Sequence, residues 1–158
     1  MKISFLCSLL SLTIAASVQT AEPDDALEAA RAEIAPLFAE MQAAANAHDT
    51  DRHVAFFARE PSLLFIINDE AIIGWEALRE KQLKWWNNGK TDVVYTRVGQ
   101  PDYKMPASGL VMLTHFLTSR RTLPSGEKRT DGFGISLLWQ RRPEGWRIIH
   151  AHEAKVQK

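Results

Sequence analysis

Apolar residues recur at helical spacing over the first third of the chain. From Pro23 to about His48 they form one stripe, which predicts a long helix. Asp25 followed three residues later by Glu28 is a capping-box pattern at its start. Pro36 interrupts the stripe, so we expect either a kink there or a separate first piece. The stripe consists of Leu27, Ala30, Ile34, Leu37, Phe38, Met41 and Ala45.

Short elements follow, separated by turn and capping residues. The predicted elements are a helix over 51–58, a strand over 62–67, a return strand over 71–73 and a helix over 75–86. Glu60-Pro61 ends the first of these helices, because the residue before a proline avoids the helical conformation. Asn87-Asn88-Gly89 is a clear stop signal for the last one.

The second half of the chain is predicted to be β-structure. Strands are expected over 91–98, 109–121, 127–140 and 146–153, with a loop over 99–106. The turn before the last strand is Arg142-Pro143-Glu144-Gly145, in which proline and glycine supply the turn geometry. The whole order predicts an α+β fold: a curved antiparallel (mixed) sheet with three N-terminal helices packed on its concave face.

Side chains of the last strand alternate between two faces. One face carries Trp146, Ile148, His150 and His152, and the other carries Arg147, Ile149, Ala151 and Glu153. Both faces are partly apolar, so both are expected to be covered. If the helices cover the concave side, then Trp146, Ile148, His150 and His152, with Phe116 or His115, remain on the convex side. We therefore expect a homodimer through this face.

The first 21 residues have the layout of a secretory signal peptide. Lys2 precedes an apolar run over 3–16, and small residues follow, so we expect cleavage between Ser17 and Glu22. The remaining 22–158 would form one domain in the periplasm or outside the cell, with no membrane association after cleavage. An uncleaved N-terminal anchor is the alternative.

The net charge and the cysteine content exclude some classes of partner and of site. The formal net charge of zero argues against nucleic acid as a partner. Cys7 is the only cysteine and lies inside the predicted signal peptide. The mature protein would then have no disulfide, thiol nucleophile or Cys-ligated metal.

Several segments resemble one family. They are Ala45–Asp51 with Phe56–Ala58, Ile73–Arg79 and, most specifically, Trp139–His152. These segments resemble the nuclear transport factor 2-like superfamily, and within it the SnoaL-like and ketosteroid-isomerase-like proteins. The closing segment is also similar to the association domain of calcium/calmodulin-dependent kinase. The resemblance implies a cone with a pocket between sheet and helices, and a dimer through the sheet.

The chain departs from the ketosteroid isomerases at their catalytic positions. The resemblance implies a general base on the first strand, where this chain has the apolar Leu64-Phe65-Ile66. It implies a tyrosine on the first helix near Met41. Only Asp131 lies near the expected position of a second acid. Glu153 replaces the small or basic residue that often follows the paired histidines.

Three residues are candidates for acid–base catalysis. His115 and Asp131, on strands joined by the turn over 123–126, can form a His–carboxylate pair, although a lone mid-strand histidine is more often a core residue. Glu153 is either a general base at the edge of a pocket or a solvated charge at a strand end.

A pocket lined by apolar residues is the usual small-molecule site. Its predicted walls are Phe65, Trp75, Tyr95, Ile135, Leu137 and Ile149, with Trp86 and Trp139 as further candidates. His150 and His152 have chelating spacing, but only His115 offers a third ligand, so we predict no metal and no cofactor. The basic residues Arg120, Arg121, Lys128 and Arg129 form either a solvated rim or an anion-attracting patch.

Three functions fit these patterns. The first is an exported domain that binds a small hydrophobic molecule without chemistry of its own. The second is an isomerase, dehydratase or cyclase that uses His115, Asp131 or Glu153. The third is a non-catalytic dimerisation or interaction module, which predicts a cone without an open cavity.

Overall fold

The computed structural model describes residues 23–156, so the predicted signal peptide over 1–21 lies outside the described residues. The helices are α1 (Pro23–Asn46), α2 (Thr50–Val54) and α3 (Trp75–Trp85). The strands are β1 (Leu64–Ile67), β2 (Glu70–Ile73), β3 (Val94–Ala107), β4 (Leu110–Thr122), β5 (Lys128–Arg142) and β6 (Gly145–Lys155). No helix in 23–156 is long and apolar enough to cross a membrane.

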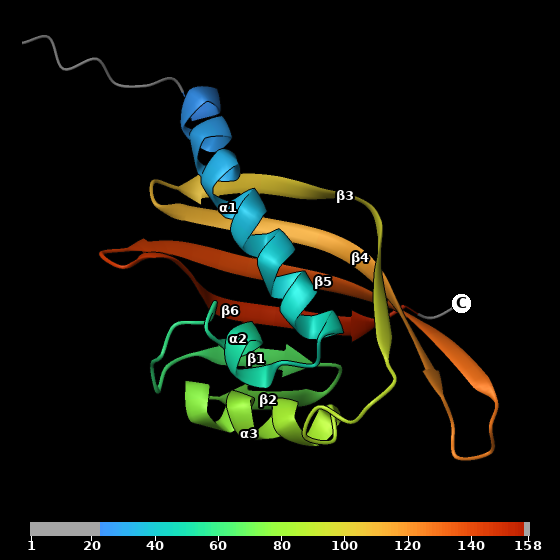
Figure 1. Ribbon diagram of the computed structural model, residues 1–158. Coiled ribbons are helices and arrows are strands. Elements are labelled where there is room, and N and C mark those ends of the chain that lie inside the picture. Colours follow the sequence, from blue (N-terminus) through green and yellow to red (C-terminus); the bar gives the residue numbers. More distant parts are fainter. Residues whose placement is uncertain (1–22, 157–158) are drawn as a thin grey trace, which may run out of the picture.

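One six-stranded sheet organises the fold, in the order β2-β1-β6-β5-β4-β3. Strands β1 and β6 are parallel and the other neighbours are antiparallel. The sheet curves around α1, and α2 and α3 close the end near β1 and β2 (Figure 1). The predicted α+β class, with helices packed on a mixed curved sheet, is confirmed.

Helix α1 presents the predicted apolar stripe to the sheet. Ala30, Ile34, Phe38 and Met41 are all buried in the main core. The helix is continuous through Pro36, so its first turns are not a separate piece. A polar contact also holds it: Glu33 accepts hydrogen bonds from Arg141 and from Nε1 of Trp146 (3.2 Å), on the β5–β6 hairpin.

Helix α2 is shorter than the predicted 51–58 and ends at Val54. The backbone after it pairs with β6 instead: the Ile148 amide donates to Phe56 (2.9 Å) and the Ala58 amide donates to Ile148 (2.8 Å). Tertiary hydrogen bonds to a neighbouring strand here replace the local helical ones. The predicted stop of α3 is correct, since Asn87 and Asn88 adopt positive φ just beyond it.

Strand β3 corrects the prediction of a strand over 91–98 and a loop over 99–106. The chain continues as one strand to Ala107, with a register shift between Val98 and Asp102. Gly99 at φ 72 lies in this irregularity. Gly99 and Pro101 lie in a bulge, and the pairing with β4 resumes after it. Glycine and proline are also turn signals, so the sequence alone does not distinguish this bulge from a loop.

Strand β6 also contains an irregularity, and it overturns the predicted faces of that strand. Trp139 pairs with Ile148, but Leu138 pairs with His150, so Ile149 is an extra residue. The inward face therefore carries Trp146 and Ile148 before the bulge and Ala151 and Glu153 after it. Strict alternation along the whole strand was the wrong assumption, because a bulge shifts the alternation by one residue.

Candidate functional site

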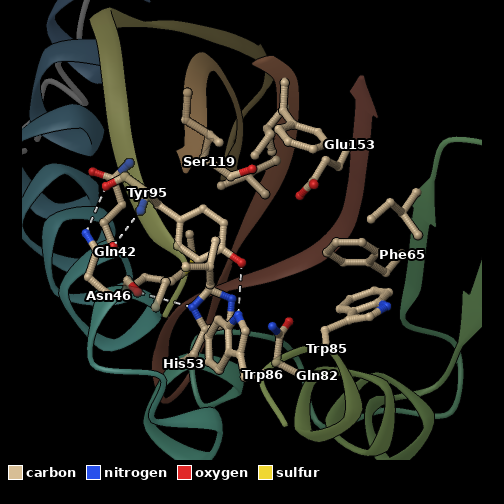
Figure 2. Close-up of a pocket in the computed structure, with 18 of the residues that line it drawn as sticks. Gln42, Asn46, His53, Phe65, Gln82, Trp85, Trp86, Tyr95, Ser119 and Glu153 are labelled. Carbon is tan, nitrogen blue, oxygen red and sulfur yellow. Dashed lines mark hydrogen bonds between the residues drawn. The ribbon is translucent and has the colours of Figure 1, made fainter. Parts of the chain in front are cut away.

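A cavity of about 350 Å³ lies between the inner face of the sheet and the three helices (Figure 2). Its floor consists of strand side chains, and its walls come from α1, α2, α3 and the start of β3. More than half of the lining residues are apolar or aromatic, and the remainder carry polar groups, a mixture that suits a small-molecule pocket.

Strand register places the floor residues in rows across the sheet. The row that matters most is Ile67, Glu153, Ile135 and His115, contributed by β1, β6, β5 and β4 in turn. Glu153 thus has an isoleucine on each side. The next row toward the cavity base is Phe65, Ala151 and Leu137. The neighbouring row on the other side contains Leu117 and Phe133.

Glu153 is a carboxylate in apolar surroundings. Burial raises its pKa from 4.5 to about 7. The ion pairs within residues 23–156 do not include it. Its carboxyl points into the cavity, on the side opposite the Tyr95 hydroxyl (Figure 2). A carboxyl with a pKa near neutrality can both accept and donate a proton at physiological pH.

Tyr95 supplies a hydroxyl whose orientation is fixed from two directions. Nε1 of Trp86 donates to its oxygen at 3.0 Å, so the hydroxyl proton of Tyr95 is left to donate elsewhere. Its backbone is clamped to α1, because Asn46 donates to the Tyr95 carbonyl (2.9 Å) and accepts from the Tyr95 amide (2.8 Å). Burial raises the pKa of Tyr95, and the charge of Glu153 raises it further.

Two histidines line the cavity in neutral form. Burial lowers the pKa of His115 and of His53 to about 4. Nδ1 of His53 contacts the Met41 carbonyl at 3.1 Å. His115 packs edge-on against Phe38, with ring centroids 4.7 Å apart, and its buried Nδ1 has no hydrogen-bond partner in the described chain. At neutral pH both imidazoles are hydrogen-bonding groups rather than cations.

Comparison with known proteins identifies the fold. The chain is similar to a nuclear transport factor 2-like superfamily protein from Salmonella enterica serovar Typhimurium, at 18% identity and a TM-score of 0.72 over 83% of this chain and 94% of that one. It is also similar to a putative dehydratase of that family from Streptomyces avermitilis (12% identity, TM-score 0.69, 87% and 100% covered).

A ketosteroid isomerase-like protein from Erwinia carotovora aligns at 15% identity and a TM-score of 0.61, over 85% of this chain and 96% of that one. This chain has the nuclear transport factor 2-like fold. No model of a protein family matches the chain, and no curated protein matches it. At these identities the likeness establishes the nuclear transport factor 2-like fold and leaves the chemistry to the site itself.

The acid of this nuclear transport factor 2-like cone lies on an unexpected strand. The resemblance implied a general base on the first strand, where Phe65 points into the cavity instead. The buried carboxylate, Glu153, lies on β6 beside Ile67 of that strand. It therefore reaches the same cavity from the adjacent strand.

The three catalytic candidates separate into two groups. His115 and Glu153 line the cavity, whereas Asp131 does not. Asp131 pairs across the sheet with Ser119 and lies four residues from Ile135, the partner of His115, which is roughly 13 Å along a strand. The predicted His115–Asp131 pair is thus not formed. Lys155 and Arg129 hold the pKa of Asp131 below its ordinary value, so it is ion-paired.

The predicted pocket walls divide in a similar way. Phe65, Tyr95, Ile135, Leu137 and Trp86 line the cavity. The other three proposed walls are elsewhere, and their contacts explain why.

Trp75 is held at the α2–α3 junction, where its Nε1 donates to the Val54 carbonyl (2.9 Å) and Arg59 lies over its ring. Trp139 is fully buried in the core, and Ile149 is the bulge residue of β6. Placing Trp75 and Ile149 in the pocket wall was wrong.

The predicted dimer face also needs correction. Trp146 and Ile148 are 3% and 0% exposed within a single chain and belong to its main core. His150 and His152 lie after the bulge and point away from that core. No group of three His, Cys, Asp or Glu side chains suited to hold a metal occurs within 23–156.

Other lining residues were missed by pattern analysis. Gln82 is 6% exposed and directs its amide toward the cavity from α3, next to Trp85 (Figure 2). Gln82 lies at helical spacing from Trp75, Leu78 and Trp85 or Trp86 in the sequence, and this shared face is the one signal available for it. His53 lies on a five-residue helix whose inward side no periodicity defines.

Replacing Glu153 by Gln tests its raised pKa. Between pH 4.5 and about 7 the folded chain keeps a proton that the unfolded chain has lost, so the free energy of unfolding falls as pH rises through this window. The carboxyl is partly exposed to the cavity, which reduces the free-energy cost of ionising it. We expect Glu153→Gln to equal the wild type near pH 4 and to be about 2 kcal/mol more stable at pH 8.

Urea unfolding at both pH values measures this difference. The exposed Glu127, in the β4–β5 turn, is the matched control, and Glu127→Gln should leave the wild-type pH dependence unchanged. Equal stability of Glu153→Gln and wild type at pH 8 would show that the carboxyl is well solvated.

Proposed function

We propose that this protein binds a small, largely apolar molecule bearing a polar group in the cavity between its sheet and helices. The cavity volume of about 350 Å³ is in the range of small-molecule sites. Phe57, Phe65 and Trp85 supply an apolar surface, while Tyr95 and Gln82 supply hydrogen-bonding groups. The interaction-module alternative predicts a filled cone, so the cavity argues against it.

The observation that carries the proposal is the solitary carboxyl of Glu153. Apolar side chains of equal size would cost less to bury there, because transfer of a charged group from water is unfavourable. Groups kept in such surroundings beside a cavity are concentrated at functional sites. Facing the Tyr95 hydroxyl, Glu153 can hydrogen-bond a ligand from the opposite side.

A proton-transfer enzyme is the second candidate. The pKa of about 7 at Glu153 favours it, since a general base works best when its pKa lies near the working pH. In this candidate Glu153 removes a proton from a bound carbon acid, and the Tyr95 hydroxyl donates to the oxygen on which negative charge develops. Isomerase-like and dehydratase names among structures of the same fold support this class.

We also propose export and self-association. A signal peptide over 1–21 would direct the chain to the periplasm or the medium, and N-terminal sequencing of the exported form should start within 18–22. The outer face of the sheet carries Phe116 (53% exposed), Val98 (52% exposed), His150 and His152, and all helices lie on the other face. A second copy of this face is the proposed cover.

Ligand binding is tested with N-phenyl-1-naphthylamine, a neutral probe that fluoresces in apolar sites. We expect micromolar binding to the wild type, because the cavity offers aromatic walls and few charges. Tyr95→Phe, which keeps the ring, should bind it within about twofold. Absence of saturable fluorescence would contradict the binding proposal.

Proton transfer is tested with 5-nitrobenzisoxazole, whose ring opens when a base removes its C3 proton, the N–O bond breaks and a coloured phenolate forms. We expect a rate that rises with pH through about 7, with roughly 100-fold loss in Glu153→Gln. Glu127→Gln is the control and should retain the rate. Turnover that is equal in all three proteins would remove this candidate.

Dimerisation is tested by sedimentation of Phe116→Glu. A charge on the outer face should convert a wild-type dimer to a monomer without loss of folding, because Phe116 lies outside the core. Lys90→Glu, on an exposed loop after α3, is the control and should remain dimeric. A wild-type monomer at micromolar concentration would contradict the proposed assembly.

A further inference from the structure

Beside the cavity, three basic side chains surround one carboxylate. Asp131 accepts a hydrogen bond from Nε of Arg129 (3.1 Å to Oδ1). Its carboxylate also forms ion pairs with Nζ of Lys155 (2.6 Å to Oδ1) and with Arg121 (3.9 Å to Oδ2). The carboxylate side chain is 9% exposed, while the three bases are 43–51% exposed. We name these four residues the rim cluster. Asp131 holds the three cations in place, and it neutralises one charge of three.

Strand register places the rim cluster directly beside the cavity floor. Asp131 is opposite Ser119, Lys155 is opposite Phe133, and Arg121 is opposite Arg129. Ser119, Phe133 and Arg121 all line the cavity. Along each of these strands, the side chains that face the cavity therefore change from apolar to cationic within one or two residues.

The charge of Arg121 reaches into the cavity. It lowers the pKa of Tyr95, opposing the effect of burial. The nearby acids are Glu153, which precedes Lys155 by two residues, and Asp92, which accepts from the Thr122 amide at the end of β4. The pKa of Asp92 is lowered mainly by its hydrogen bonds to Thr122, so that acid already has a partner.

We infer that the cavity takes an amphiphile with one anionic group, the anion lying at the rim cluster and the apolar body lying over Phe133 and Phe65. Carboxylate, sulfonate and phosphate groups share the required chemistry. This inference rests on the proposed binding function and names its ligand class. The three cations are partly exposed, so keeping them beside the cavity requires little desolvation. They attract the anionic group of a ligand, while the apolar part of the ligand is buried in the cavity.

The four basic residues of the β4–β5 hairpin are separated by strand alternation. Arg121 and Arg129 lie on the inner face with the cavity, whereas Arg120 and Lys128 lie on the outer face. Arg120 is therefore a matched control: it is adjacent in sequence, equal in charge and exposed, and it points away from the cavity.

The experiment compares two probes with the same ring system. N-phenyl-1-naphthylamine is neutral, and 1-anilinonaphthalene-8-sulfonate carries a sulfonate. In low salt we expect Arg121→Gln to weaken sulfonate binding about fivefold and to leave the neutral probe within twofold, in line with a partly exposed charge pair. Arg120→Gln should change neither affinity. The sulfonate should displace the neutral probe, and salt should weaken the sulfonate alone.

Each result distinguishes the two proposals. Binding of the neutral probe, with sulfonate affinity equal in Arg121→Gln and Arg120→Gln, would overturn the rim inference and leave the binding proposal standing. Failure of the sulfonate to displace the neutral probe would overturn it too. If neither probe binds the wild type, the cavity is not a ligand site, and the binding proposal fails together with the inference. Circular dichroism of each variant confirms that it is folded.

Discussion

The extra residue in β6 is the constraint on which both the core and the cavity depend. Before Ile149, the side chains of Trp146 and Ile148 face the core beneath α1, and Trp146 also donates a hydrogen bond to Glu33 of that helix. After it, the alternation has shifted by one, and Glu153 faces the same side. Without the bulge a strand that buried Trp146 would point Glu153 away from the helices, because side chains alternate with a period of two. The bulge therefore places a core anchor and a buried acid on one face of one strand.

The electrostatics of the cavity follow from that placement. Glu153 lies between Ile67 and Ile135, whose side chains offer no hydrogen bond and no polar group to solvate a charge, so its neutral form is favoured. The helices complete the enclosure rather than supply countercharge. Asn46 fixes Tyr95 by two backbone hydrogen bonds, and Trp86 fixes its hydroxyl. The cavity is thus a site in which one acid and one hydroxyl are held in position before any ligand enters.

Polarity changes in one direction across the sheet floor. Phe65 and Leu137 lie at the apolar end, Glu153 and His115 lie in the middle, and the rim cluster lies where β4, β5 and β6 leave the cover of the helices. A ligand that matches this gradient has a single orientation, with its charged end toward the solvent. This arrangement suits both ligand binding and proton transfer, because both need the ligand to be held in one orientation relative to Glu153.

The order and type of the elements were determined by the sequence alone, because periodicity, caps and turn residues act locally: the stripe of α1, the stop at Asn87 and the Arg142–Gly145 turn are all where the pattern placed them. The resemblance to the nuclear transport factor 2-like superfamily was likewise readable and is confirmed at the level of fold. Only the tertiary structure decided which face each side chain occupies. The register shifts in β3 and the bulge in β6 depend on pairing with a neighbouring strand and leave no local signal. The sequence therefore could not show that Glu153 is buried rather than solvated at a strand end, or that Trp146 lies in the core rather than on a dimer face.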